Sequence, residues 1–305
     1  MKKDSNDKKD KKKTKDIEEE NTNETKSHIF IKLFMFIIII ISSVYLYAKY
    51  VGIKGLIVKE YRINSEILSN NFDGLKIIHF SDTLYNSTFD LNDFKDLVNN
   101  INKLKPDIIV FTGDLTLNNK VSNDDKEKII SYLSDMTASI GKYAIKGEND
   151  YSYSEYEYVM EKSDFVLLDN SYEEIYYKDS NPIYIVGLPS SDKEQVNLSE
   201  SFKFYNEENR KYIICLAHDG KTISYLDDST YEVDLILGGH SLNGSIDAPY
   251  YGALFLDDLS SKYYSEHYEK GITNIYISSG LGTRKYHYRF NNKPSFNLYR
   301  LKAQK

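Results

Sequence analysis

Five short apolar runs in this chain each end in acidic residues or a histidine. Apolar runs of this length, bounded by glycine or polar turns, predict buried strands. Folds of the open α/β class gather such strand ends at one edge of a sheet. The pattern therefore predicts an α/β domain that brings together the residues following the runs, which are Asp82, Asp114, Glu148 with Asp150, His218 and His240.

Carboxylate and imidazole side chains together are ligands for a divalent cation. This mixture suits Mn, Fe, Zn or Mg rather than a metal selected by thiolates. Each residue alone is weaker evidence, because a single strand-end aspartate is more often a turn or helix cap. His79 lies inside its run rather than after it, and we assign it no ligand role. It is the joint pattern that predicts a metal site.

An apolar run of 20 residues, 29–48, precedes these strands and carries one charge, Lys32, near its start. This length spans a bilayer, and a lysine near the end can extend to the surface. A cleaved signal peptide would need a shorter apolar core and a cleavage site of small residues. The sequence AKYVGIKG after the run offers no convincing cleavage site, so we expect an uncleaved signal anchor with a single transmembrane pass.

Residues 1–28, before the anchor, are dominated by lysine and acidic residues. Such a segment buries too little apolar surface to offset its ordering entropy, and we expect a disordered tail. Its lysines favour an N-terminus on the inner side of the membrane. The globular domain, residues 52–305, is then expected to be extracytoplasmic.

The charge argues against one class of partner, and the cysteine content argues against disulfides. The net charge is −7, with lysines and acidic residues interspersed. Because there is no basic stripe, we expect no nucleic-acid partner. The single cysteine, Cys215, lies inside an apolar run, so it forms no disulfide within the chain and is expected to be a small buried hydrophobic residue.

Hydrophobic periodicity indicates the other elements of one α/β domain. We expect helices over residues 91–104 and 124–135, where apolar residues recur at helical spacing. We find no internal repeat and no linker after the anchor. The expected strands lie within residues 75–82, 107–114, 142–150, 183–188, 212–220, 234–241, 274–282 and 295–301.

The order and spacing of the strand-end motifs resemble the calcineurin-like metallophosphoesterases, particularly their membrane-associated or exported bacterial branch. The family signature is D-x-H, G-D, G-N-H-D/E, H and G-H-x-H. The corresponding stretches here are SDTL, GD, GEND, H and GHSL, and the resemblance covers residues 56–301. It implies a four-layer αββα sandwich of two mixed β-sheets, with a two-metal site between strand ends and hydrolysis of phosphate esters.

The chain departs from that signature at four positions. Leu84, Asn149 and Leu242 stand where the family has histidines, and Glu148 stands where it has asparagine. The resemblance assigns the lost histidine of G-N-H a supporting role in the reaction, which Asn149 cannot fill because an amide delivers no proton at neutral pH. We therefore expect impaired hydrolysis.

The departures fall unevenly on the two implied metal sites. By position, the first metal would keep Asp82 and Asp114 but lose both imidazoles, since Leu84 and Leu242 replace them. We expect these two leucines to approach each other where that metal would lie. The second metal would keep a full set of ligands. The resemblance thus implies that one metal site is lost and that one divalent metal (Mn, Zn, Fe or Mg) can still bind at Asp114, Glu148, His218 and His240.

Three functions remain open from the sequence, and they leave enzyme status undecided. The favoured one is a pseudoenzyme without significant hydrolysis, which binds a phosphate-containing ligand or a protein partner, or acts as a scaffold at the membrane. The second is an active phosphoesterase that uses a single-metal mechanism, with Asp82 or Asp150 as base, on a mono- or diester such as an envelope or lipid-linked phosphate. The third is a metal-free structural domain in which Glu148 pairs with a histidine.

A basic stretch near the C-terminus, GTRKYHYRF, is a candidate phosphate contact, and surface charges beside a strand explain it equally well. It contains Arg284, Lys285 and Arg289. Of these, Arg289 matches the arginine of the family's RF position, so we expect it rather than Arg284 to contact phosphate.

Overall fold

A computed structural model describes residues 26, 28–178, 181–260 and 262–304. The chain divides into two compact units between Ala48 and Lys49. The first described element is an apolar helix, His28–Val51, whose length and composition would allow it to cross a membrane. Its last turn, Tyr47–Val51, is π-helical. The expected disordered tail lies almost wholly outside the described residues.

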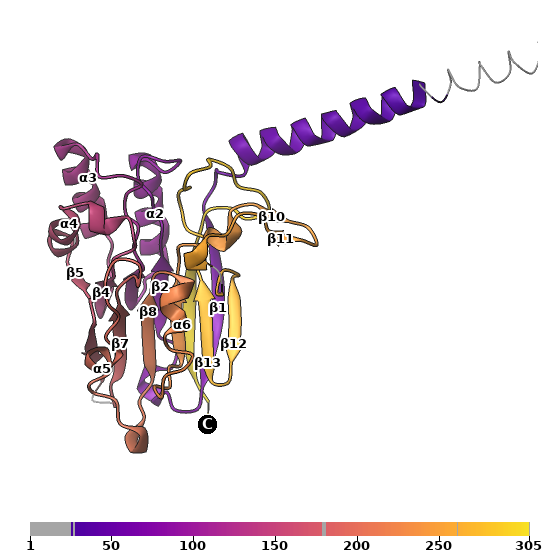
Figure 1. Ribbon diagram of the computed structural model, residues 1–305. Helices are drawn as coiled ribbons and strands as arrows, with labels where there is room; N and C mark the ends of the chain where they lie inside the picture. The colour runs from indigo at the N-terminus through magenta and orange to yellow at the C-terminus, as the bar shows by residue number, and fades with distance from the viewer. Residues whose placement is uncertain (1–25, 27, 179–180, 261, 305) are drawn as a thin grey trace, which may run out of the picture. The chain divides into compact units, whose positions relative to one another are not determined.

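Two six-stranded mixed sheets form the second unit (Figure 1). The first sheet has the order β1-β14-β2-β3-β4-β5, and β14 is antiparallel to β2 while the other pairs are parallel. Its strands are β1 (Ile57–Ser65), β2 (Lys76–Phe80), β3 (Ile108–Phe111), β4 (Gly141–Ala144), β5 (Phe165–Leu167) and β14 (Ser295–Ala303).

The second sheet has the order β12-β13-β9-β8-β7-β6. Its central strands are parallel, and its two edge strands run antiparallel to their neighbours. Its strands are β6 (Ser171–Ile175), β7 (Ile183–Leu188), β8 (Ile213–Ala217), β9 (Leu235–Gly238), β12 (His267–Lys270) and β13 (Thr273–Ile277). A separate hairpin pairs β10 (Asp247–Ala248) with β11 (Gly252–Ala253).

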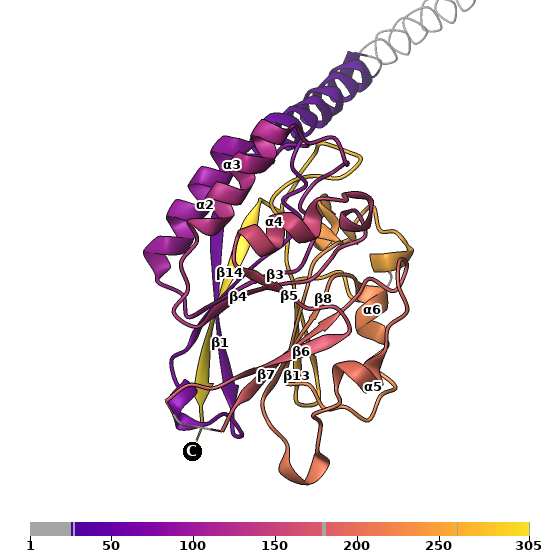
Figure 2. The same ribbon diagram turned by 90° about the vertical axis from the view of Figure 1, so that its left-hand side faces the viewer.

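Helices cover the outer faces of both sheets (Figure 2). Helices α2 (Leu91–Leu104), α3 (Asn123–Ser134) and α4 (Tyr156–Lys162) pack on the first sheet, and the short α5 (Leu198–Ser201) and α6 (Gly220–Ser224) pack on the second. Single helical turns complete the unit: η2 (Asn70–Phe72), η3 (Asp150–Ser152), η4 (Glu207–Asn209), η5 (Leu242–Gly244) and η6 (Asp258–Ser260). The layers are therefore α, β, β and α, as the resemblance implied.

Apolar side chains point to both faces of each sheet, which gives three hydrophobic cores: one between the two sheets and one under the helices on each outer face. In β3, Ile108 and Val110 face the core between the sheets, while Ile109 and Phe111 face the helices. Successive side chains of a strand point to opposite faces, so an unbroken apolar strand must be covered on both. Cys215 follows the same rule: it is fully buried under the helices of the second sheet, and burial raises the pKa of its thiol.

The helix predicted over residues 91–104 is confirmed as α2. Asp90 caps its N-terminus by accepting hydrogen bonds from the backbone N–H groups of Asn92 and Asp93, at 2.7 and 3.2 Å. At the other end, Lys105 adopts a left-handed conformation and Pro106 follows. A proline cannot continue a helix and disfavours helical geometry in the residue before it, which explains the stop.

Candidate metal centre

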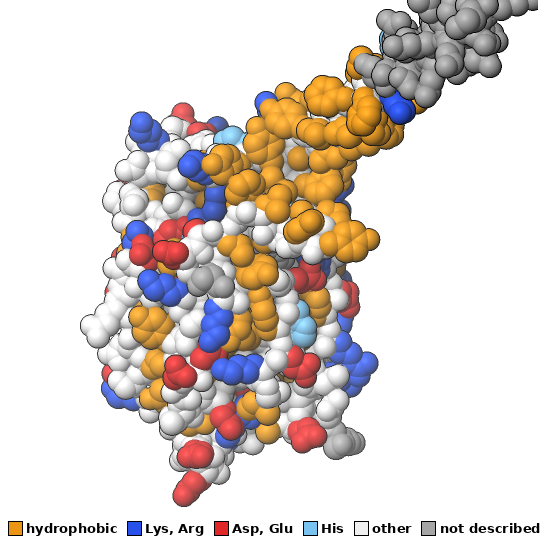
Figure 3. Space-filling view, turned by 45° about the vertical axis from the view of Figure 1, so that its right-hand side comes forward, with side chains coloured by type: hydrophobic (Ala, Val, Ile, Leu, Met, Phe, Trp, Pro, Cys, Tyr) orange, Lys and Arg blue, Asp and Glu red, His pale blue; other side chains and the backbone are white. Residues whose placement is uncertain are grey.

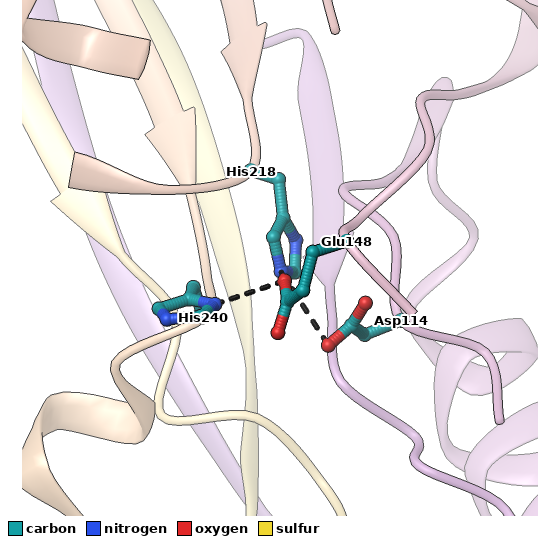
Figure 4. A group of neighbouring side chains, drawn as sticks. All are labelled: Asp114, Glu148, His218 and His240. Carbon is teal, nitrogen blue, oxygen red and sulfur yellow. Dashed lines mark hydrogen bonds and ion pairs between the residues drawn. The ribbon is translucent and has the colours of Figure 1, made fainter. Parts of the chain in front are cut away.

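The predicted residues follow strands whose carboxyl ends meet at one edge of the two sheets. All five strands belong to parallel pairs, so their ends point the same way within each sheet. The pairs of strand and residue are β2 with Asp82, β3 with Asp114, β4 with Glu148, β8 with His218 and β9 with His240. All five residues are largely buried, and Figure 4 shows four of them pointing toward one another.

Unusual backbone geometry holds these side chains at the strand ends. Asp82, Asp114 and His240 have φ angles of 50°, 63° and 62°, in the left-handed region that residues other than glycine rarely adopt. Gly113 has φ 93°, and a Cβ there would lie 2.2 Å from the backbone nitrogen of Gly147. The loops after β3 and β4 can therefore approach each other only because both positions are glycine.

Glu148 lies at the centre of the group. Its Oε2 atom is 2.8 Å from Nε2 of His218 and 2.9 Å from Nδ1 of His240 (Figure 4). Burial alone would raise the pKa of Glu148, but the positive charges of Arg284 and His218 outweigh burial and hold this pKa well below its usual value. Glu148 is therefore an anion between two imidazole rings.

Both histidines have second partners that fix their rings. Nδ1 of His218 donates to the carbonyl of Thr112 at 2.5 Å, which turns Nε2 toward Glu148 and toward Asp114, 3.6 Å away. Burial would lower the pKa of His218, but the charges of Asp114 and Glu148 outweigh it and raise this pKa well above its usual value. In the absence of a metal, His218 is therefore a cation.

His240 is held between an inner and an outer carboxylate. Its Nε2 atom lies 2.9 Å from a carboxylate oxygen of Asp257, a residue that precedes η6 and whose side chain is 57% exposed. Burial and the charge of Arg284 act to lower the pKa of His240, while its hydrogen bonds to Asp257 and Glu148 raise it, and the net shift is upward. Asp257 was not predicted from sequence, since it lies in no motif and follows no predicted strand.

Arg284 provides the central cation of the group. Its Nη2 atom donates to Oδ1 of Asp82 at 3.0 Å and to Oδ2 of Asp114 at 2.8 Å, and its Nη1 atom donates to Glu148. Its Nε atom donates to the carbonyl oxygen of His240 at 2.9 Å. Three carboxylates raise the pKa of Arg284 against the opposing effect of burial. All three carboxylates therefore share the single positive charge of Arg284.

The two implied metal sites differ in how well the residues suit a cation. Asp114, Glu148, His218 and His240 each offer one ligand atom, and these atoms all lie within 4.8 Å of one another. That donor set fits one divalent cation. The implied first site does not fit, because leucines replace both of its imidazoles and leave it only two carboxylates, each bonded to Arg284. Arg284 also bonds to Asp114 and Glu148 of the second set, but that set keeps two imidazoles as ligands.

Asn149 and Asp150 lie beside the group in different roles. Asn149 donates to Asp114 twice, from its backbone nitrogen at 2.9 Å and from Nδ2 at 2.6 Å. Asp150 instead accepts from the backbone nitrogens of Asp114, Leu115 and Gly147, at 2.7, 2.9 and 2.8 Å. Burial and the nearby Asp114 raise the pKa of Asp150 well above its usual value. Its geometry ties two loops together, and its role as a base stays a prediction.

The structure does not bring Arg289 to the group. Its side chain is fully buried, and its guanidinium donates to the carbonyl oxygens of Gly282 at 2.6 Å and Asn292 at 3.4 Å. Burial lowers the pKa of Arg289 to about 10, against the opposing charge of Asp82. The expected phosphate contact by Arg289 thus has no support in its surroundings, and Arg284 is the arginine that reaches the carboxylates.

The replacing leucines are both buried close to the loop after β13. A Cβ at Gly280 would lie 2.3 Å from Cδ2 of Leu242, and a Cβ at Gly282 would lie 2.8 Å from Cβ of Leu84. Both leucines are at most 1% exposed. The expectation that the two approach each other stays a prediction.

A cavity of about 450 Å³ adjoins His240 and Arg284. Its polar lining includes Ser241 and Lys285, and its apolar lining includes Phe255. The group of charged residues is therefore accessible to a ligand from this side.

Comparison with known proteins identifies the family. The family model described as calcineurin-like phosphoesterase matches residues 75–244, more than half of the chain. "Uncharacterized metallophosphoesterase YkuE" of Bacillus subtilis (strain 168) is 31% identical over 262 residues, which are 85% of this chain and 90% of that protein.

Two more distant relatives have informative names. "UDP-2,3-diacylglucosamine pyrophosphatase LpxG" of Chlamydia muridarum is 25% identical, over 74% of this chain and 83% of that protein. "Transmembrane protein with metallophosphoesterase domain" of Danio rerio is 23% identical, over 74% of this chain and 52% of that protein. With the αββα layers and the strand-end residues described above, these matches show that the chain belongs to the calcineurin-like phosphoesterase family.

Proposed function

We propose that this chain is a membrane-anchored member of the family that binds a phosphate-containing ligand without significant hydrolysis. One observation carries the proposal: the guanidinium of Arg284 bonds to Asp82 and Asp114, the two carboxylates that remain of the implied first metal site. An arginine supplies positive charge there and stays protonated. It offers no open coordination position, so it does not replace a metal in activating water.

The loss of proton-transfer groups supports the same proposal. Asn149 stands at the position of a family histidine, and its side-chain amide donates a hydrogen bond to Asp114. General acid–base catalysis typically contributes about 10²–10⁴-fold to a rate. A two-metal site also stabilises both the attacking and the leaving oxygens, and a single cation supplies only part of that effect. With both lost, binding of a phosphate is easier to sustain than its hydrolysis.

The ligand side of the group suits an anion. Arg284 and the exposed Lys285 both line the cavity, together with Ser241, Ser245 and one carboxylate residue, Asp257. Guanidinium and hydroxyl groups are good partners for phosphate oxygens. The LpxG relative carries in its name a pyrophosphatase activity on a diacylated sugar nucleotide, which makes a lipid-linked phosphate a reasonable ligand class. A protein partner in the same cavity is the other outcome of a binding test.

The N-terminal helix provides the location. His28–Val51 is long and apolar enough to cross a membrane once, and the preceding lysines favour an inner N-terminus. In this topology the domain is extracytoplasmic, and the helix acts as an uncleaved signal anchor.

A single-metal phosphoesterase is the second candidate, and the four-residue group favours it. Asp114, Glu148, His218 and His240 would hold one divalent cation, which would supply Lewis-acid charge beside a bound phosphate. Arg284 would then have to release Asp114 and Glu148, and it would be free to bind phosphate. Asp82 would remain as the carboxylate outside that ligand set.

Turnover and metal content of the full chain in detergent distinguish the candidates. Nitrophenyl phosphate and bis-nitrophenyl phosphate are tested with Mn, Mg and Zn, and the matched control is His240→Ala. We expect no turnover above the control and at most one divalent cation per chain, which the control loses. Metal-dependent turnover that disappears in His240→Ala would replace the proposal with the single-metal enzyme. Two cations per chain would contradict the loss of the first site.

A further inference from the structure

We propose that the β10–β11 hairpin and the segment after it rest on the lipid bilayer in which the chain's own helix is anchored. These residues, 247–256 with Tyr286 beside them, are called the apolar rim below. The inference concerns how the domain meets the membrane, and it does not depend on whether the site hydrolyses phosphate. It follows from the direction of two strands, the length of the tether and the composition of the rim.

The chain enters the globular unit at the same edge as the candidate metal centre. β1 pairs in parallel with β14, starting with Ile57 beside Ser295. β14 pairs antiparallel with β2, with Asn297 beside His79, so β14 starts where β2 ends. Hydrogen bonds fix the start of β14 near Asp82: the backbone nitrogen of Ser295 donates to the carbonyl of Gly280, and that of Leu281 donates to the carbonyl of Asp82. Ile57 therefore lies at the edge that carries Asp82.

The tether between anchor and domain is short. The apolar helix ends at Val51 and β1 begins at Ile57, which leaves five residues, 52–56. Six steps of extended chain span at most roughly 20 Å. If the helix crosses the bilayer, the edge of the domain that bears the metal centre lies within that distance of the membrane surface.

The same edge exposes a cluster of aromatic and aliphatic side chains. Tyr250 and Tyr251 in the turn of the hairpin are 105% and 87% exposed, and Phe255 is 58% exposed. The rings of Phe255 and Tyr286 pack in a tilted arrangement, with their centroids 5.5 Å apart. Leu254 and Leu256 extend the apolar rim beside them, at 52% and 40% exposed. Figure 3 brings this side of the molecule forward and shows hydrophobic side chains exposed in the upper part of the domain's surface.

The rim adjoins the metal centre directly. Asp257, the residue after the rim, bonds to His240, and the backbone nitrogen of Asp247 donates to Phe290 at 3.0 Å. Leu254, Phe255 and Leu256 also line the cavity beside Arg284. One wall of that cavity is thus made of residues that would touch the membrane.

The composition of the rim suits a bilayer surface. Tyrosines are enriched where a membrane meets water, because their rings are apolar and their hydroxyls are polar. Phenylalanine and leucine insert among the acyl chains just below. An exposed patch of this kind is costly in water and marks a contact surface. The tether already places a membrane near this edge, which selects the bilayer over a separate partner. The cavity beside Arg284 would then open at the bilayer surface.

The chain contains no tryptophan, so a single introduced tryptophan reports on its own surroundings. Phe255→Trp places the reporter in the rim. Ile272→Trp is the matched control, because Ile272 is a 52% exposed hydrophobic residue in the turn between β12 and β13. That turn precedes β13, which is parallel to β9, so it lies at the edge opposite the metal centre. Tyr251→Trp is a second rim reporter if Phe255→Trp does not fold.

Both variants of the full chain are reconstituted in phosphatidylcholine vesicles with and without lipids brominated near the head of the acyl chain. We expect Phe255→Trp to lose most of its fluorescence to the brominated lipid and Ile272→Trp to lose almost none. Equal quenching of the two, or quenching of Ile272→Trp alone, would overturn the proposal. So would a rim reporter that lipid does not quench but that becomes shielded as protein concentration rises, since it would indicate contact with a second copy.

Discussion

The negative charge of the carboxylates is compensated in different ways in two halves of the candidate metal centre. In the arginine half, Asp82 and Asp114 bond to the guanidinium of Arg284. In the histidine half, Glu148 lies between His218 and His240, which are cationic only while protonated. The arginine half carries a fixed cation that needs no loading and cannot be exchanged. The histidine half keeps groups that can either bind protons or bind a metal.

The largest expected effect comes from removing the fixed cation. Arg284→Ala removes the ion-pair partner of the buried Asp82 and leaves Asp114 with His218, 3.6 Å away. Breaking a buried ion pair by removal of one partner typically costs about 3–5 kcal/mol. We expect a loss of that size in the free energy of unfolding, measured by denaturant titration at neutral pH. If a metal bound in the histidine half can replace the positive charge of Arg284, added Mn or Zn should restore part of the lost stability.

Two variants test the reason for that loss. Lys285→Ala removes the adjacent, exposed cation and should leave the free energy of unfolding within about 0.5 kcal/mol of the parent. Arg284→Lys keeps the charge but loses the planar fork that reaches several carboxylates at once, so it should be intermediate. An Arg284→Ala variant as stable as Lys285→Ala would show that the arginine half is not held by this cation.

Glu148→Gln changes the histidine half and should have the next largest effect. The amide keeps the size of the side chain but removes the anion that faces both imidazoles and Arg284. Leaving buried polar partners poorly paired costs about 1–3 kcal/mol, and we expect a loss of unfolding free energy in that range. The matched control is Glu157→Gln, because Glu157 pairs with Lys146 but its side chain is 69% exposed. Equal losses in both variants would contradict a special role for Glu148.

A third histidine lies outside both halves and sharpens the comparison. His79 is fully buried in β2, where Nε2 lies 2.9 Å from Oγ1 of Thr112, and burial lowers its pKa to about 3. The folded state keeps this ring neutral while the unfolded state binds a proton below about pH 6.5. The contribution of His79 to stability is therefore present above that pH and is lost as the pH falls toward 3.

The expected size of the His79 effect is about 1.4 kcal/mol of unfolding free energy for each pH unit below the unfolded pKa. His79→Gln removes the titrating group and should flatten the decline of stability between pH 6 and pH 5 by about that amount. Denaturant titrations of the two chains at both values measure it. Parallel curves for parent and variant would mean that His79 does not differ from its unfolded state in proton binding.

Local rules made much of the fold predictable from sequence. The bounds of α2 follow from helical spacing, the cap at Asp90 and the stop at Pro106. The carboxyl ends of β2, β3, β4, β8 and β9 could be placed because apolar runs stop at glycines and polar turns. These signals lie within a few residues of one another, so no knowledge of distant packing was needed.

The role of Arg284 could not be predicted in the same way, because it depends on distant contacts. Arg284 and Arg289 lie five positions apart in one basic stretch, and nothing in their spacing says which one points inward. A usable signal did exist: Asp82 and Asp114 are kept while leucines replace the two histidines of their site, and Glu148 adds a third carboxylate, so the group needs a compensating cation. The β10–β11 hairpin and Asp257 were also missed, since their strands are two residues long and carry no periodic pattern.

Asp257 and Glu148 bond to opposite nitrogens of the same ring, and their comparison gives the smallest expected effect. Asp257→Asn removes the outer charge from His240, but the side chain of Asp257 is 57% exposed. Exposed ion pairs contribute about 0.2–1 kcal/mol, so we expect a loss of unfolding free energy in that range, below that of Glu148→Gln. The control is Asp258→Asn, which changes the neighbouring exposed carboxylate. A larger loss of unfolding free energy in Asp257→Asn than in Glu148→Gln would contradict this order. It would show that the outer carboxylate, rather than the inner one, holds His240 in place.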